Sequence, residues 1–183
     1  MTARPGGYRA GMFGRGDVNA VLETRVRASG AAARELRVAL DEIAVAAVAA
    51  IDGADYAGIT LVQADFGLRC LAATDVHPLM LANIARRRRQ GPYFRLMADR
   101  RPVCVVDLTE DIRWPGFAAD AAATTPVRSL LAQNVFDASG WCTVFTLYGD
   151  RPAAFDADTA VRVARFGAEL AQVLAAAPSG RDG

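Results

Sequence analysis

Residues 127–148, VRSLLAQNVFDASGWCTVFTLY, decide the fold of this chain, because they contain two strand-like segments joined by a short turn. The segments 127–136 and 141–148 are rich in Val, Leu, Phe and Thr, and the residues between them, Asp-Ala-Ser-Gly, are typical of a turn. Apolar side chains fall on both faces of each segment, which is typical of strands covered on both sides. The stretch therefore predicts a long hairpin that lies between helices.

The chain on either side of this hairpin supplies further strands and the helices that cover them. Strands are predicted at 58–63, 68–73 and 103–106, with 64–67 as the loop of a first hairpin. Helices are predicted at 31–51, 79–89, 93–99 and 117–123, and 107–116 is expected to be a loop. A last helix follows Asp156, a typical N-cap residue. This order predicts an antiparallel sheet with helices on both faces.

Length and composition indicate one globular domain. The chain has 183 residues, 52% of them apolar, and its net charge of +1 provides no general field for nucleic acid or an anionic membrane. It has no Lys, which excludes Schiff-base chemistry and the lysine of a phosphate-binding P-loop. Three scattered cysteines and the lack of a signal peptide or a membrane-spanning run predict a cytoplasmic protein.

The domain boundaries follow from the same pattern. Residues 1–16 are Gly-rich and are expected to be a flexible tail, and 17–30 contain a short helical pattern that ends at a Ser-Gly pair. The folded domain is expected over 31–177, with a flexible C-terminal tail at 178–183.

Several segments, taken in order, resemble GAF domains, in particular those of actinobacterial signalling proteins that pair GAF with an RNA-binding ANTAR domain. The most specific segment is 105–118, VVDLTEDIRWPGFA, and the resemblance covers roughly 35–177. The other matching segments are DYAGITL at 55–61, LAATD at 71–75, VRSLL at 127–131, LY at 147–148, Pro152, and AFD at 154–156.

The resemblance implies an α/β/α three-layer sandwich whose central antiparallel sheet has five or six strands. It also implies a ligand pocket on one face of the sheet and a homodimer formed through the first and last helices. Two features depart from the family. No ANTAR segment follows the last helix, so a separate signalling output protein is expected. Residues 89–93, Arg-Gln-Gly-Pro-Tyr, stand where the family has a Gly-Glu-Gly-Pro-Cys-like segment.

The residues expected at the pocket are chosen from this resemblance and from side chains that can bind ligands or react. Each of them also has a purely structural interpretation. His77 is a haem ligand or a residue at a helix start, and the three cysteines are redox groups or small buried side chains. Asp107, Glu110 and Asp111 ligate a cation or cap turns. The arginines at 86–89, 95, 100 and 101 bind phosphate, nucleotide or RNA, or form a solvated face. The pocket candidates are Cys70, His77, Tyr93, Phe94, Asp107, Trp114, Phe117 and Arg128.

The sequence contains no catalytic motif, no metal-binding spacing and no cofactor signature. It therefore predicts a regulatory GAF domain that senses an unidentified small molecule in signal transduction, with no catalytic residue, no metal and no membrane contact. One alternative is a degenerate GAF domain that serves only for dimerisation or docking. Another is a redox enzyme of the methionine sulfoxide reductase kind.

Overall fold

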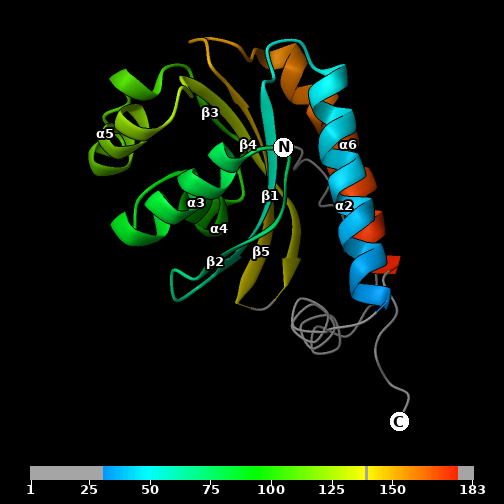
Figure 1. Cartoon of the computed structure of the whole chain (residues 1–183). Coiled ribbons are helices and arrows are strands. Elements are labelled where there is room, and N and C mark those ends of the chain that lie inside the picture. Colours follow the sequence, from blue (N-terminus) through cyan, green and yellow to red (C-terminus); the bar gives the residue numbers. More distant parts are fainter. Residues whose placement is uncertain (1–30, 139, 177–183) are drawn as a thin grey trace, which may run out of the picture.

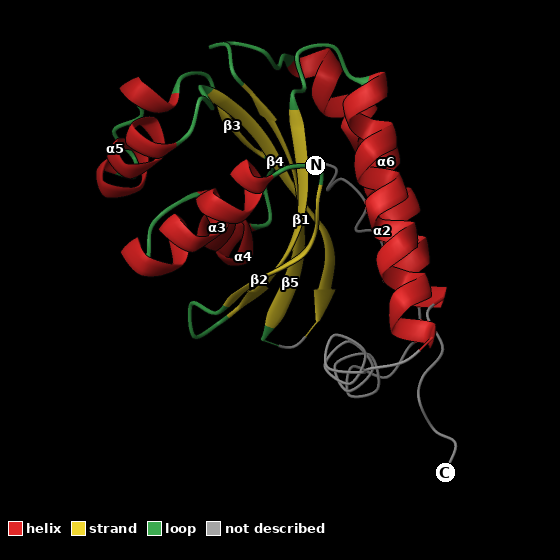
Figure 2. Cartoon of the chain, in the orientation of Figure 1, coloured by secondary structure: helices red, strands yellow, loops and turns green. Residues whose placement is uncertain are grey.

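The computed structural model describes residues 31–138 and 140–176. The segments expected as tails, 1–16 and 178–183, and the helical pattern within 17–30 lie outside these residues. The described chain folds into three layers, with the sheet in the middle (Figures 1 and 2). Two long helices cover one face of the sheet, and three shorter helices cover the other, as the sequence predicts.

The sheet has five strands in the order β2-β1-β5-β4-β3, and every neighbouring pair is antiparallel. The predicted long hairpin is confirmed and supplies strands β4 and β5, so that β5 lies at the centre of the sheet. The strands are β1 (Tyr56–Gln63), β2 (Leu68–Ala73), β3 (Val103–Val105), β4 (Ser129–Ala138) and β5 (Trp141–Gly149).

The long helices α2 (Ala31–Ala50) and α6 (Ala157–Ala176) lie side by side on one face (Figure 1). The opposite face carries α3 (Val76–Arg88), α4 (Pro92–Asp99) and α5 (Pro115–Thr124), and the 3₁₀ turn η1 (Leu108–Glu110) precedes α5. The side chain of Asp156 accepts a hydrogen bond from the backbone N–H of Thr159 at 2.8 Å, so it caps α6 as predicted.

Strand β5 shows why both faces of the sheet are buried. Val144 and Tyr148 belong to the core beneath α3, α4 and α5, whereas Phe145 and Leu147 belong to the core beneath α2 and α6. All four side chains are fully buried. Burial of one such side chain contributes about 1.5–3 kcal/mol, so this strand joins two cores that stabilise the same sheet.

Several predicted boundaries are wrong by one to three residues. Helix α3 begins at Val76 rather than at 79, because Asp75 caps it by accepting from the backbone N–H of His77, and Pro78 is tolerated in a first turn. Strand β4 runs from Ser129 to Ala138 rather than over 127–136, and β3 ends one residue early at Val105. The expected loop at 107–116 contains η1 and the start of α5, which Pro115 opens.

Candidate functional site

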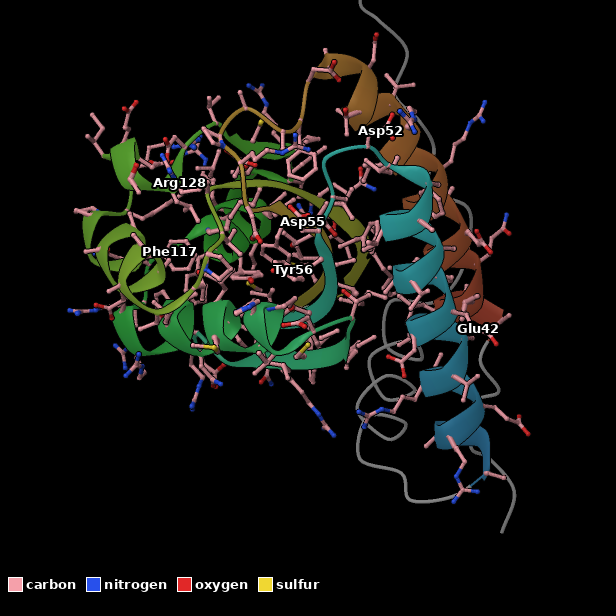
Figure 3. All side chains as sticks on the ribbon, turned by 45° about the horizontal axis from the view of Figure 1, so that its top comes forward. Glu42, Asp52, Asp55, Tyr56, Phe117 and Arg128 are labelled. Carbon is pink, nitrogen blue, oxygen red and sulfur yellow. The ribbon has the colours of Figure 1, made fainter. Side chains whose placement is uncertain are left out.

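The layer between the sheet and helices α3, α4 and α5, where the GAF resemblance implies a pocket, is filled by the protein's own side chains. Tyr93, Leu96, Phe117 and Tyr148 are all fully buried there. The hydroxyl groups of Tyr93 and Tyr148 are 2.7 Å apart and form a hydrogen bond. Figure 3 shows Phe117 inside this layer, with Arg128 near its rim and Glu42 on the opposite side of the sheet.

This filled layer retains polar groups among its apolar side chains. Burial raises the pKa of both Tyr93 and Tyr148, which stay neutral and hydrogen-bonded to each other. Thr146 is also fully buried, and its Oγ1 has no hydrogen-bond partner within the described part of the chain. Gly58 allows α3 to approach the sheet, because a Cβ at this position would lie only 3.0 Å from the Cβ of Pro78.

Two hollows on the described surface lie at β3, an edge strand of the sheet, and they share Cys104 and Arg113. We call the larger hollow, of about 550 Å³, the β3-edge cleft. Its lining residues are Arg95, Asp99, Arg101, Pro102, Val103, Cys104, Arg113 and Trp114. The smaller hollow, of about 450 Å³, is the acidic hollow, lined by Cys104, Val106, Asp107, Glu110, Asp111, Ile112 and Arg113.

Arg113 forms the wall between the two hollows and is held from three sides. Its Nη2 donates to the backbone carbonyl of Cys104 at 3.0 Å and to Asp111 Oδ2 at 2.6 Å. Its guanidinium carbon lies 4.6 Å from the centre of the Trp114 ring, within the range of a cation–π contact. Burial alone would raise the pKa of Asp111, but the hydrogen bonds from Arg113 outweigh it and lower that pKa.

The β3-edge cleft is lined by both charged and apolar residues. Three arginines and one aspartate supply its charged groups, whereas Pro102, Val103 and Trp114 supply its apolar wall. Arg95 is already paired with Asp99, with Nε 2.5 Å from Oδ2. The guanidinium of Arg101 has no hydrogen-bond or ion-pair partner among residues 31–138 and 140–176, so it is available to a ligand.

Two of the predicted pocket residues, Asp107 and Arg128, form an ion pair beside the acidic hollow. Arg128 Nε donates to Asp107 Oδ1 at 3.0 Å, and Nη2 donates to Oδ2 at 2.5 Å. Asp107 also caps η1 by accepting from the backbone N–H of Thr109. The hydrogen bonds from Arg128 are the main reason that the pKa of Asp107 lies well below its ordinary value. This pair joins the start of β4 to the loop after β3.

The remaining predicted pocket residues lie in different places. His77 is in the first turn of α3, where its ring packs edge-on against Tyr56 at 4.9 Å between centroids. Phe94 on α4 packs against Phe66 of the β1–β2 loop at 5.0 Å. The structure therefore brings Tyr93 and Phe117 together in the core and places Trp114 and Asp107 at the two hollows. Phe94 also packs against this core, and Cys70 is close enough to raise the pKa of Tyr93 and Tyr148, whereas His77 belongs to neither group.

The three cysteines are far apart in the sheet. Cys70 is on β2 and Cys104 on β3, the two edge strands, so four strand spacings separate them, roughly 19 Å. Cys142 on the central strand is two spacings, about 10 Å, from either edge, beyond the Cα separation of a disulfide. Burial raises the pKa of Cys70 to about 11 and that of Cys142 to about 12, and partial burial also raises the pKa of Cys104.

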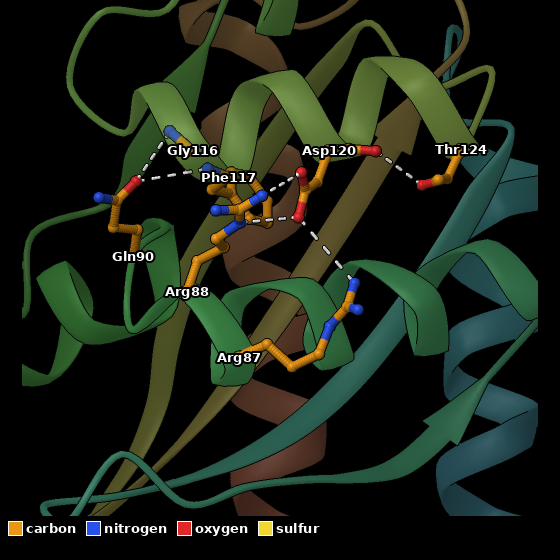
Figure 4. Close-up of polar contacts among 7 residues, drawn as sticks. All are labelled: Arg87, Arg88, Gln90, Gly116, Phe117, Asp120 and Thr124. Atoms are coloured by element: carbon orange, nitrogen blue, oxygen red, sulfur yellow. Dashed lines mark hydrogen bonds and ion pairs between the residues drawn. The ribbon is translucent and has the colours of Figure 1, made fainter.

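The run of arginines at the end of α3 serves largely to attach α5. Arg88 makes two hydrogen bonds with Asp120, at 2.8 and 2.6 Å, and lowers its pKa. The Oε1 of Gln90 accepts from the backbone N–H groups of Gly116 and Phe117 and so caps α5 (Figure 4). Arg89 instead lies over the Phe66 ring. These contacts account for much of the charge that the sequence presents as a basic patch.

Strand β3 is connected directly to the segment that precedes α6. The backbone N–H of Ala153 donates to the carbonyl of Val106 at 2.7 Å. The thiol of Cys104 points to the carbonyl of Phe155 at 3.8 Å, two residues before α6 begins. The residue that lines both hollows therefore also contacts the start of one of the two long helices.

The sequence did not single out Arg113 as a site residue, although it lies in the Arg-Trp-Pro part of the most specific segment. Its importance depends on the edge position of β3, which the local sequence does not reveal.

Within the described residues, no group of three or more His, Cys, Asp or Glu side chains is arranged to hold a metal ion. None of the described helices is both long and apolar enough to cross a membrane.

Comparison with known proteins relates this geometry to a class of fold. No protein-family model matches the chain, and no curated protein sequence matches it. Solved structures do match. The GAF domain region of a protein from Geobacter sulfurreducens is 14% identical with a TM-score of 0.61, and the match covers 85% of this chain and 98% of that one. The GAF domain of a Coxiella burnetii phosphoenolpyruvate-protein phosphotransferase is 12% identical with a TM-score of 0.59, covering 89% and 95%.

An enzyme is also among the similar structures. The type II free methionine-R-sulfoxide reductase of Thermoplasma acidophilum is 10% identical with a TM-score of 0.60, and the match covers 80% of this chain and 97% of that one. At these identities the likeness shows the fold. The described residues therefore have the fold of these GAF domains, and the reductase has a similar structure.

Proposed function

We propose that this chain is a non-catalytic regulatory GAF domain that binds a small molecule in the β3-edge cleft. The observation that carries the proposal is the cleft itself, with a volume of about 550 Å³ and three guanidinium groups beside an apolar wall. Small-molecule sites are concave and largely apolar, with a few polar groups that fix the ligand. The filled interior beneath α3, α4 and α5 moves the proposed site from the face of the sheet to its edge.

The proposed output is a change in the position of α6. Cys104 lines the cleft and contacts the carbonyl of Phe155, just before α6, and Val106 is bonded to Ala153 in the same connection. A ligand that prefers one position of β3 therefore also biases the start of α6. Such coupling requires only that the ligand bind the two positions with different affinity.

We propose that α2 and α6 form the interface that receives this signal, as a homodimer or with a separate signalling output protein in the cytoplasm. Three valines remain exposed on these helices: Val38 at 50% and Val45 at 58% on α2, and Val161 at 70% on α6. Both helices lie on the side of the sheet opposite α3, α4 and α5 (Figure 1). Burial of each valine against a second copy contributes about 1–2 kcal/mol.

The interface is tested by light scattering of the purified chain and of a Val38→Glu/Val45→Glu variant. The proposal expects a dimer that becomes a monomer in the variant, because two buried carboxylates in an apolar interface are strongly unfavourable. Val76→Glu is the matched control, since Val76 is 54% exposed on α3, across the sheet from the interface. A wild-type monomer, or a variant that remains dimeric, contradicts the proposed interface.

The ligand part of the proposal is tested by native mass spectrometry of the full chain. A retained ligand appears as mass above the protomer multiple, and it should be lost in a Trp114→Ala variant. A dimer that carries no extra mass, and whose melting temperature no metabolite in a broad screen changes, favours the alternative of a domain used only for association. The filled interior of the GAF layer supports that alternative.

A reductase is the second alternative, and the likeness to the Thermoplasma enzyme motivates it. The separation of the thiols and their raised pKa values oppose it, because the thiolate is the reactive form of cysteine. The test is turnover of free methionine-R-sulfoxide with a dithiol reductant, for the wild type and for each Cys→Ser variant. Turnover that disappears in one of these variants would establish the enzyme.

A further inference from the structure

We infer that the β3-edge cleft is specific for a small molecule that carries a carboxylate or phosphate group on a flat apolar body. This inference rests on the proposed function, because it names the class of ligand for the same cleft. Two features of the cleft support it: the availability of its guanidinium groups for hydrogen bonds, and the presence of apolar residues in the same lining.

The net positive charge of the lining residues favours an anionic ligand. Arg95, Arg101 and Arg113 outnumber Asp99, the one acidic side chain in the lining. Asp99 is already satisfied by Arg95 and by the backbone N–H of Arg101. A second anionic group therefore gains the attraction of the remaining guanidinium groups without displacing Asp99. A cation would meet the same groups as a repulsion, and the neighbouring acidic hollow would suit it better.

The guanidinium groups differ in how many hydrogen bonds they already make within the protein. Arg101 has no side-chain partner in the described part of the chain, whereas Arg113 is held by Asp111 and by the carbonyl of Cys104. The Nη1 of Arg113 makes no hydrogen bond within the described residues, so the group is fixed in place with donors to spare. Guanidinium groups bind carboxylate and phosphate through paired hydrogen bonds, so Arg101 and Arg113, which line the same cleft, are the groups we expect to clamp one anionic group.

The apolar lining residues limit the rest of the ligand. Pro102, Val103 and Trp114 line the cleft without contributing an ionisable group. Trp114 is partly buried against the core, and its ring is anchored by Arg113, so it offers a rigid surface. A flat ring gains contact with such a surface at little entropic cost. The cleft therefore fits an anion attached to a ring-sized apolar group better than it fits a bare inorganic ion.

The test uses Trp114 as a reporter. The chain has two tryptophans, so a Trp141→Phe variant leaves Trp114 as the single emitter at the cleft. In the phosphate arm this protein is titrated with adenosine monophosphate, and adenosine is the neutral match. In the carboxylate arm it is titrated with benzoate, and benzamide is the neutral match. The difference between the two arms identifies which anion the cleft prefers.

We expect at least one anion to change Trp114 emission, and its neutral match to bind at least about tenfold more weakly, because the clamp acts on the charge. Arg101→Gln should weaken binding of that anion by about tenfold or more, and raising the salt from about 0.05 to 0.5 M should weaken it further. Arg86→Gln is the matched control: it removes the same charge from an exposed position on α3 outside the cleft, and binding should not change.

Nuclear magnetic resonance of the arginine Nε–H groups gives an independent readout. The signals of Arg95, Arg101 and Arg113 should shift on titration, and that of Arg86 should not. The inference is overturned if neutral molecules bind as well as anions, if Arg101→Gln binds like Arg86→Gln, or if no anion of either arm binds to the folded protein. Binding of neutral ligands alone would leave the sensor function standing. Anion binding that leaves the α2 and α6 interface unchanged would contradict only the proposed output.

Discussion

Gln133 on β4 and Gly167 on α6 occupy complementary positions where the last helix crosses the sheet. The side-chain amide of Gln133 donates to the carbonyl of Val163 at 2.9 Å. A Cβ on Gly167 would overlap the Nε2 atom of Gln133, and it would also lie 3.0 Å from Val135. The missing side chain at 167 thus allows a polar group of the sheet to reach the backbone of the helix.

We therefore expect Gly167→Ala to destabilise the fold, although alanine is the better helix former. Overpacking of this kind costs about 1–3 kcal/mol, more than the gain in helix propensity of about 1 kcal/mol. Urea unfolding measures the difference. Gln133→Ala in the same chain makes space for the new methyl group, so the double variant should be more stable than the sum of the two single effects predicts. Strict additivity would contradict this account.

The contribution of the Asp107–Arg128 ion pair to the free energy of unfolding should depend on pH. The folded pKa of Asp107 lies below its ordinary value of 3.8, so its contribution is complete above that value and is lost as the pH falls below it toward the lower folded pKa. The melting temperature of Asp107→Asn should therefore lie below that of the wild type near pH 7. The gap should narrow as the pH falls below about 4. A gap that is independent of pH would show that the carboxylate charge has no role.

Two buried tyrosines and the partly buried Tyr56 should make the protein sensitive to alkali. Burial, followed by the hydrogen bond to Asp150, raises the pKa of Tyr56 to about 12, and burial also raises those of Tyr93 and Tyr148. A raised pKa means that the stability these groups contribute is complete below the unfolded value of 10 and is lost as the pH rises above it. Most of the tyrosinate absorbance at about pH 11 should appear only after urea is added.

The cap that Gln90 provides to α5 should be sensitive to the loss of its oxygen. Gln90→Ala leaves the N–H groups of Gly116 and Phe117 without this acceptor, which should cost about 0.5–2 kcal/mol of unfolding free energy. Gln90→Glu keeps the acceptor and adds a negative charge at a helix N-terminus, so it should be neutral or stabilising. Equal loss in the two variants would show that packing, and not capping, decides the effect.

The parts of the fold that the sequence predicts correctly are those governed by local periodicity. The apolar stripes of α2 and α6 and the doubly buried hairpin of β4 and β5 are visible as repeats along the chain, and the structure confirms them. The start of α3 was placed too late because Pro78 was taken as its boundary, whereas Asp75 caps the helix and Pro78 fits its first turn. Helix α5 was predicted too short because its sequence is rich in Ala, so apolar and polar residues do not alternate clearly with a helical period.

The candidate site was only partly predictable, because it depends on distant segments. The β3-edge cleft combines the end of α4, the edge strand β3 and the Arg113–Trp114 loop. Of its lining residues, Trp114 was predicted at the pocket, whereas Arg95 and Arg101 were considered only as part of a basic patch and Cys104 only as a redox group. Whether Tyr93 and Phe117 line an open pocket or fill a closed one depends on how side-chain volumes add up across three helices and the sheet. No periodicity in the sequence carries that information.

The hydrogen bond from Arg113 to the carbonyl of Cys104 bears on the solubility of the protein at high concentration. β3 is the last strand of the sheet, and open backbone groups on such a strand are a template for pairing with other chains. The guanidinium occupies the outward carbonyl that an incoming strand would need. We therefore expect that replacing Arg113 to alter ligand binding would also lower the solubility of the protein.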